Sequence, residues 1–268
     1  MNHRRVLKIG SLLLVLALVF SFACAPTGKV EQPEKVITIG TMNLPTGLNV
    51  FQTTGNVFYG LIAWVYDSLY ELGPEDVARP NLAKNIEISE DRLTYTITIR
   101  DDATWWDGTP LTAEDVAFTY NYIVDNDLSW YASICTQIQG WEAIDDYTVE
   151  MTLKEQVNPD WLKYNPFYIV PIIPKHVWQD VTPEEALGEL PLEMTHGSGP
   201  YQVVEFVADE YVRLDATPFA KEVLGANIDE YIIKGYADAS VMLQDFKAGN
   251  IDTVYGGMDF KMAKALEP

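Results

Sequence analysis

The chain has 268 residues, of which 48% are hydrophobic and 21% are charged, as expected for a globular protein of one or two domains. Asp and Glu number 39 against 18 Lys and Arg, so the formal net charge is −21. Nucleic-acid binding depends on a positively charged surface, and this balance excludes it. Three His and two Cys are too few for most zinc, haem or iron–sulfur sites, so we expect no metal and no cofactor.

The N-terminal segment predicts export. Arg4, Arg5 and Lys8 precede an uncharged apolar run at 9–22, which is the pattern of a signal peptide. The run is short for a membrane span, which needs about 20 apolar residues. We therefore expect a signal peptide at 1–24 and a flexible linker at 25–35.

Two processing routes compete at Cys24. Ala23-Cys24-Ala25 fits the small-x-small site of ordinary secretion, whereas Ser21-Phe22-Ala23-Cys24 resembles an imperfect bacterial lipobox. We expect lipidation of Cys24, with ordinary cleavage as the alternative. The mature chain would then lie in the periplasm or on the outer face of the cytoplasmic membrane, held by a lipid anchor. Cys135 would have no intrachain disulfide partner.

The first half of the chain predicts hairpins interspersed with helices. Period-two alternation of β-branched residues indicates strands, and apolar residues at three- and four-residue steps indicate helices. We expect a strand at 36–39, a helix at 57–69, a hairpin of strands 86–89 and 94–99, a helix at 112–122, and a second hairpin of strands 141–144 and 147–153. Thr112 would cap its helix, with Asp115 at the third helical position.

The second half is punctuated by Pro and Gly, and its strands resume only at 201–207 and 211–215. A strand at 228–234, a helix capped by Asp238 and ended by Gly249, and a strand at 251–255 follow. A crossover of that length implies parallel pairing in an α/β layer.

Motifs of catalysis are missing from the sequence. Ser198 lies in Gly-Ser-Gly, not in Gly-x-Ser-x-Gly, and His196 has no obvious orienting partner, so we interpret this segment as a turn. His176 begins a short helix, where a surface or capping role is expected. We expect no catalytic residue, although a carboxylate pair of the glycosidase kind depends on spatial separation alone.

Six segments together resemble a known family. They are Pro-Asn-Leu-Ala at 80–83, Trp-Asp-Gly-Thr-Pro-Leu-Thr-Ala-Glu-Asp-Val at 106–116, Ile-Asp-Asp-Tyr-Thr-Val at 144–149, Ile-Pro-Lys-His-Val at 173–177, Gly-Pro-Tyr at 199–201 and Lys-Ala-Gly-Asn-Ile-Asp at 247–252. This series resembles the family 5 extracellular solute-binding proteins, the oligopeptide- and dipeptide-binding receptors of ABC importers. The resemblance extends from Val36 to about Met262.

The resemblance implies a periplasmic-binding-protein-like α/β fold of the class II type. Residues 36–55 and 166–268 would form an incomplete ligand-binding lobe, with a smaller α+β domain inserted at 56–165. Members of the family are longer, so we expect the second large lobe to be missing and the chain to be a fragment. A half-site open to solvent is then expected to bind ligand poorly.

The resemblance also places three segments at the ligand cleft, and two of them follow strands, where open α/β sheets bind ligands. The predicted ligand-binding residues are Met42, Asn43, Leu44, Pro45, Tyr131, Tyr255, Gly256 and Gly257. Packing within the small domain is the alternative for Tyr131.

The implied function is capture of an oligopeptide and its delivery to the permease subunits of an ABC importer, without catalysis. An oligosaccharide ligand is the first alternative, because 7 Trp and 15 Tyr would suit stacking on sugar rings. The alternative of another class is a secreted polysaccharide hydrolase.

Overall fold

The computed structural model describes residues 35–52, 56–222 and 224–256. All of them belong to one compact unit, which starts at residue 34. The predicted signal peptide, Cys24 and nearly all of the predicted linker lie outside the described residues. Within the described part, no helix combines the length and the apolar character that a membrane span requires.

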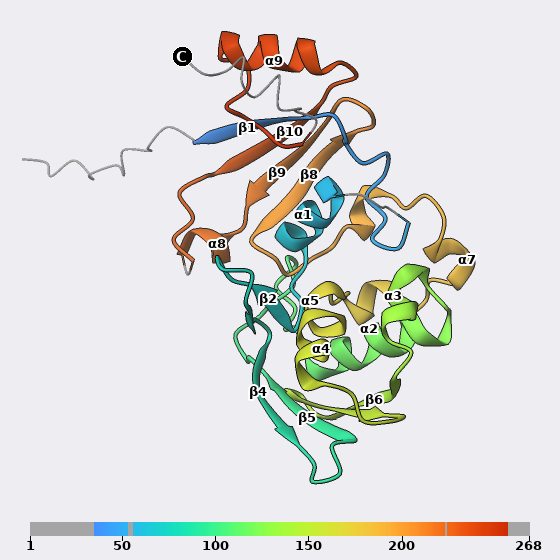
Figure 1. Cartoon of the computed structure of the whole chain (residues 1–268). Helices are drawn as coiled ribbons and strands as arrows, with labels where there is room; N and C mark the ends of the chain where they lie inside the picture. The colour runs from blue at the N-terminus through green and yellow to red at the C-terminus, as the bar shows by residue number, and fades with distance from the viewer. Residues whose placement is uncertain (1–34, 53–55, 223, 257–268) are drawn as a thin grey trace, which may run out of the picture. The chain divides into compact units, whose positions relative to one another are not determined.

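One sheet has five strands in the order β11-β1-β10-β9-β8. Its strands are β1 (Val36–Thr41), β8 (Tyr201–Val207), β9 (Tyr211–Ala216), β10 (Glu230–Gly235) and β11 (Thr253–Val254). β8 and β9 form an antiparallel hairpin, and β9 pairs antiparallel with β10 (Figure 1). The strands predicted at 201–207 and 211–215 are therefore confirmed.

The first strand enters this sheet from the opposite end of the sequence. β1 pairs in parallel with β10 on one side and with β11 on the other. The helix α9 (Ala239–Ala248) connects β10 to β11 and packs on β1 and β11. The predicted parallel crossover is confirmed, but its two strands do not pair directly, because β1 lies between them.

Local signals set both ends of α9. The Asp238 carboxylate accepts hydrogen bonds from the backbone N–H groups of Ser240 at 2.7 Å and Val241 at 3.1 Å, which satisfies free amides of the first turn. Gly249 ends the helix at φ +76°, a left-handed conformation that glycine adopts without steric cost.

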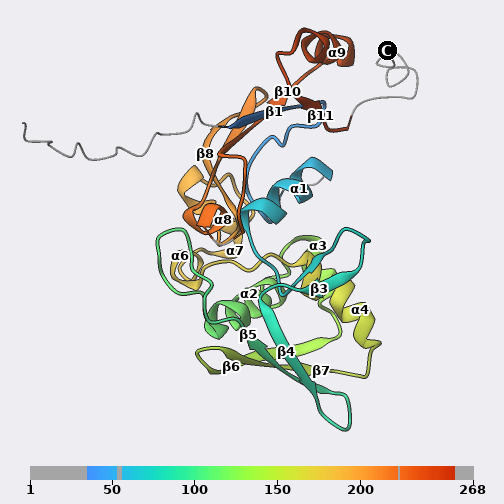
Figure 2. The same cartoon turned by 90° about the vertical axis from the view of Figure 1, so that its left-hand side faces the viewer.

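A second sheet has four antiparallel strands in the order β4-β5-β7-β6. They are β4 (Ala83–Ile88), β5 (Thr94–Ile99), β6 (Ile138–Asp145) and β7 (Thr148–Leu153), and they confirm both predicted hairpins. The helix α2 (Ala113–Asp125) packs on β6 and β7 (Figure 2). A separate small hairpin joins β2 (Tyr70–Leu72) to β3 (Ala78–Pro80).

Asp115 anchors α2 from inside the protein. Its carboxylate is buried and accepts the backbone N–H groups of Thr112 and Lys175, each at 2.9 Å. The Nε1–H of Trp105 donates to the same carboxylate at 3.4 Å. The predicted capping box is confirmed, and Asp115 also ties the helix to two segments distant in sequence.

The helix α1 (Asn56–Val65) ends four residues before the predicted end at Leu69. The Val65 carbonyl accepts a hydrogen bond from the Gly199 N–H at 2.9 Å, and the Asp67 N–H donates to Ser198 Oγ at 3.3 Å. The Gly-Ser-Gly segment therefore satisfies backbone groups that a longer helix would have paired, and the chain leaves the helix there.

The other helices of the described chain are short. They are α3 (Ser129–Ile134), α4 (Pro159–Tyr164), α5 (Pro166–Ile169), α6 (Lys175–Trp178), α7 (Pro183–Ala186), a 3₁₀ turn (Leu192–Met194) and α8 (Pro218–Glu222). The helix α1 packs on β8, and α6 packs on α2. Each of these two helices therefore contacts an element on the other side of the predicted domain boundaries at 55 and 165. A single buried cluster joins side chains from both sheets and from α1, including Ile97, Leu214 and Leu61.

Candidate functional site

The three parallel strands of the five-stranded sheet end at one edge, which we call the carboxyl edge. The Tyr236 N–H, just after β10, donates to the Thr41 carbonyl at 2.8 Å. The Tyr255 N–H, just after β11, donates to the Gly40 carbonyl at 2.9 Å. The segments that follow β10 and β11 are thus both held to the end of β1, at the edge where loops of α/β sheets bind ligands.

The predicted segment Met42–Pro45 starts at this edge. The Asn43 N–H donates to Thr41 Oγ1 at 3.2 Å, which turns the chain directly after β1. Leu44 packs against the core and Pro45 is buried, while the Asn43 side chain is exposed and Met42 is half-buried. The apolar residues fix the loop, and Asn43 presents an amide that can donate and accept.

Tyr255 and Gly256 lie beside this loop. The Tyr255 side chain is 49% exposed. Gly256 has φ +70°, and a Cβ placed on it would lie 3.8 Å from Nδ2 of Asn43. The structure therefore brings Asn43 and Gly256 together, as the predicted site requires. Gly257 lies outside the described residues.

Tyr131 does not lie at the carboxyl edge. It belongs to α3 and is 1% exposed. Its ring contacts Phe51 edge-on at 6.2 Å between centroids and stacks on Trp130 at 5.0 Å. These surroundings match the packing alternative for Tyr131, since a ligand has no access to the ring in this arrangement.

An ionic network near the carboxyl edge was not predicted from the sequence. The Asp245 carboxylate of α9 accepts the Tyr236 hydroxyl at 2.7 Å and Nζ of Lys234 at 3.1 Å. Hydrogen bonds from Tyr236, Asn250 and Lys234 lower the pKa of Asp245 to about 2. The carboxylate is therefore charged at neutral pH and holds α9 against the end of β10.

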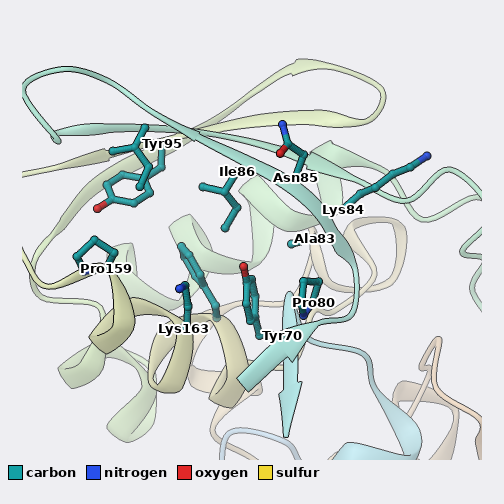
Figure 3. Close-up of a pocket in the computed structure, with 11 residues that line it drawn as sticks. Tyr70, Pro80, Ala83, Lys84, Asn85, Ile86, Tyr95, Pro159 and Lys163 are labelled. Atoms are coloured by element: carbon teal, nitrogen blue, oxygen red, sulfur yellow. The ribbon is translucent and has the colours of Figure 1, made fainter. Parts of the chain in front are cut away.

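A separate cavity of about 340 Å³ lies between the β4–β5 hairpin and α4. Ile86 and Tyr95 face it from the hairpin, and Tyr70 and Lys163 face it from the other side (Figure 3). None of the predicted ligand-binding residues lines it. The cavity is thus distinct from the carboxyl edge.

Two histidines converge on one carboxylate elsewhere in the structure. Oδ2 of Asp107 lies 3.0 Å from Nε2 of His176 and 3.5 Å from Nε2 of His196. We call these three residues the His–Asp cluster. The expectation that His196 lacks an orienting partner is wrong, because contacts between distant segments create one that local sequence does not show.

Electrostatics at the His–Asp cluster favour a charged carboxylate. Burial acts to raise the pKa of Asp107, but hydrogen bonds from Thr109 and the nearby His196 and His176 outweigh it and lower the pKa to about 2. Burial lowers the pKa of His196, against the opposing effect of Asp107. The anionic Oδ2 of Asp107 therefore faces the imidazole ring of His196, whose neutral form is favoured by burial.

Comparison with known proteins identifies the family. The model of the bacterial extracellular solute-binding proteins, family 5 Middle, matches residues 77–265. The chain belongs to family 5. The resemblance inferred from the sequence motifs is thereby confirmed, and so is the partial α/β lobe of this family.

Individual relatives agree with this assignment. The oligopeptide-binding protein OppA of Bacillus subtilis is 27% identical over 91% of the chain and 48% of its own length. The ABC transporter substrate-binding protein CtaP of Listeria monocytogenes is 30% identical, with a TM-score of 0.67 over 81% of this chain and 44% of that one. The oligopeptide-binding protein AppA of Bacillus subtilis, solved with a nonapeptide, shares the fold at 24% identity and a TM-score of 0.73, over 82% of this chain and 44% of that one.

The family 5 chain is short beside these proteins. It spans about half the length of the curated relatives that it matches. What the structure describes is therefore one part of the fold that the relatives share.

Proposed function

We propose that this family 5 chain forms part of an extracellular receptor that captures oligopeptides and delivers them to the permease of an ABC importer, without catalysis. The family match and the names of OppA and CtaP support this role. The observation that carries the proposal is the meeting of Asn43 and Gly256 at the carboxyl edge, beside the exposed ring of Tyr255.

The chemistry of this edge suits a peptide. A peptide main chain offers alternating N–H and C=O groups, and the Asn43 amide can pair with either kind. Gly256 carries no side chain, so a ligand can approach the main chain closely there. The Tyr255 ring supplies apolar surface that accepts side chains of varied shape.

Binding without turnover is supported by the structural role of the Ser198 hydroxyl. Its hydroxyl oxygen accepts the Asp67 N–H at 3.3 Å, and the residue is buried. This hydroxyl thus serves the turn that ends α1, which is a structural role.

We further propose that Cys24 is lipidated and anchors the receptor to the membrane. Partition of the native protein into detergent tests this anchor.

Calorimetric titration of the native protein with oligopeptides tests the ligand class. Asn43→Ala and Tyr255→Ala are each expected to weaken peptide binding about tenfold, equivalent to ~1.4 kcal/mol. Tyr164→Ala is the matched control, because Tyr164 is an exposed tyrosine of α4, 40% exposed, and is expected to leave affinity unchanged.

Three results would contradict the proposal. Release of cleaved product from a pure preparation would show an enzyme. Binding of cello-oligosaccharides but not of peptides would move the ligand to sugars. Equal affinity in Tyr255→Ala, Asn43→Ala and Tyr164→Ala would remove the carboxyl edge as the site.

A further inference from the structure

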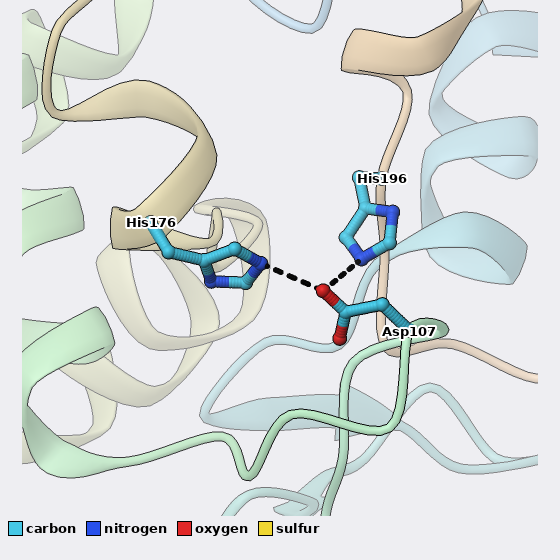
Figure 4. A group of neighbouring side chains, drawn as sticks. All are labelled: Asp107, His176 and His196. Carbon is cyan, nitrogen blue, oxygen red and sulfur yellow. Dashed lines mark hydrogen bonds and ion pairs between the residues drawn. The ribbon is translucent and has the colours of Figure 1, made fainter.

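The three members of the His–Asp cluster come from segments far apart in the sequence. Asp107 lies in the loop before α2, His176 in α6, and His196 just before the Gly-Ser-Gly turn. Each offers one ligand atom, and the three atoms lie within 4.8 Å of one another. Both imidazole Nε2 atoms face the same carboxylate oxygen (Figure 4).

We propose that Asp107, His176 and His196 form a binding site for a divalent transition-metal ion, with Zn²⁺ as the best match and a fourth position open to water. Zn²⁺ binds imidazole nitrogen and carboxylate oxygen at about 2.0–2.2 Å, so two ligand atoms on a tetrahedral ion lie roughly 3.3–3.5 Å apart. The observed separations of 3.0 and 3.5 Å from Asp107 Oδ2 are close to this value, and the ligand nitrogens of the two histidines lie within 4.8 Å of each other.

The donor set selects the class of ion. Two imidazoles with one carboxylate suit zinc and its neighbours in the first transition row, whereas calcium and magnesium prefer oxygen ligands alone. Three protein ligands with an open position are the pattern of accessible zinc sites. The side chains of Asp107, His176 and His196 are 40%, 37% and 18% exposed, so an ion can enter from solvent.

The carboxylate is oriented in advance. The Thr109 N–H donates to Oδ1 of Asp107 at 2.8 Å, and this leaves Oδ2 directed at the two histidines. On the other side, the His176 ring packs edge-on against Trp105, whose Nε1–H is held by Asp115. Ligand orientation by such outer contacts raises metal affinity, because less order must be imposed on binding.

The backbone that carries His196 is also fixed. Trp106 donates its backbone N–H to the Gly197 carbonyl at 3.1 Å and its indole Nε1–H to the Gly199 carbonyl at 3.0 Å. A Cβ on Gly197 would lie 1.7 Å from the Val65 carbonyl oxygen, so only glycine allows this close approach. Asp107 and His196 are thereby held next to each other by their own chain neighbours.

His196 supplies a second, independent observation. Its Nε2 atom is buried, and its contact with Oδ2 of Asp107 at 3.5 Å is too long for an ordinary hydrogen bond. A buried polar atom that is paired so weakly is costly, and an ion at this position would give it a close partner. The hydrogen bond between His176 and Asp107 alone leaves Nε2 of His196 unsatisfied.

The site is independent of the proposed peptide function. It shares no residue with the carboxyl edge at Asn43, Tyr255 and Gly256, so either proposal can fail alone. A bound ion would add a link between three segments that backbone hydrogen bonds already hold together, and would stabilise the fold by binding the native state.

Titration of the full chain, prepared without a histidine tag, with Zn²⁺ tests the site. We expect one ion per chain by calorimetry and a rise in Tm of roughly 5–10 °C at a Zn²⁺ concentration about 100 times the Kd. Co²⁺ is expected to give the visible absorption of a tetrahedral complex with nitrogen ligands. His176→Gln and His196→Gln should each weaken Zn²⁺ binding by more than about 10-fold.

Asp146→Asn is the matched control, because Asp146 is an exposed acid in the β6–β7 turn, outside the His–Asp cluster. It should leave Zn²⁺ affinity unchanged. His176→Gln keeps an exposed polar side chain, and its Tm without metal reports whether it folds. Zn²⁺ binding that is equal in the wild type, His176→Gln and His196→Gln, or no binding by the wild type, would overturn the proposal.

Discussion

The carbonyl of Gly40 accepts the backbone N–H of Tyr255 at 2.9 Å, and this bond continues the β1–β11 pairing beyond its last strand residue. The exposed Tyr255 ring is therefore carried by backbone that β1 holds in place. Gly40 allows this arrangement because a side chain there would meet residues on three sides.

Gly40→Ala is expected to destabilise the protein by about 1–3 kcal/mol through overpacking. A Cβ at this position would lie 2.5 Å from Cδ1 of Ile251 and 3.1 Å from Cγ of Met242, and both side chains are buried. Urea unfolding measures the change. Gly60→Ala is the control, because nothing lies within 4 Å of its Cβ position, and it should stabilise α1 by roughly 0.5–1 kcal/mol. Equal effects of the two variants would argue against crowding at Gly40.

Asp115→Ala is expected to cost about 2–4 kcal/mol, because it leaves the N–H groups of Thr112 and Lys175 without their buried acceptor. Glu185→Ala removes the carboxylate from the exposed capping box of α7 and should cost less than about 1 kcal/mol. Thermal unfolding of the two variants provides the comparison. A loss no larger in Asp115→Ala than in Glu185→Ala would contradict the anchoring role.

Tyr131→Ala should destabilise the fold by about 3–5 kcal/mol, because it removes a ring that is 1% exposed. Tyr255→Ala, at a position 49% exposed, should change stability by no more than about 0.5 kcal/mol. Chemical denaturation of both variants separates a packing role from a surface role. A neutral Tyr131→Ala variant would return Tyr131 to the ligand-binding candidates.

His196 should make stability depend on pH in the acid range. Burial lowers its pKa in the folded state, against the opposing pull of Asp107, so the unfolded chain binds the proton first as pH falls. The stabilisation is therefore complete above the unfolded pKa of about 6.5 and is lost as pH falls towards the folded pKa. Unfolding free energies measured between about pH 7 and pH 5 should decline more in the wild type than in His196→Gln. Parallel profiles would show that His196 does not carry the effect.

Local sequence signals predicted the elements that local interactions determine. The Thr112–Asp115 box, the Asp238 cap and Gly249 all mark helix ends where the structure has them, because each satisfies or frees backbone groups within one turn. The hairpins are likewise confirmed, since alternation and turn residues lie within a few positions of each other.

Contacts between distant segments could not be predicted in the same way. The position of β1 between β10 and β11 depends on pairing across most of the chain. The early end of α1 depends on Gly199 reaching Val65, and the His–Asp cluster depends on Asp107 meeting two histidines from other segments. The apolar pattern from 57 to 69 correctly indicated that Leu69 is buried, but it did not indicate that the helix ends at Val65.

The position of β1 also bears on the order in which the chain folds. The Lys35 N–H bonds to the Asp229 carboxylate 194 residues away, and β1 gains both sheet partners only from that late part of the chain. Closing so long a loop costs entropy before any pairing is gained, and parallel pairing over such separations is slow. The β4-β5-β7-β6 sheet needs a shorter closure, because its most distant pairing joins Thr94 to Thr152. During synthesis, β1 therefore gains neither sheet partner until a part of the chain about 194 residues further on has been made.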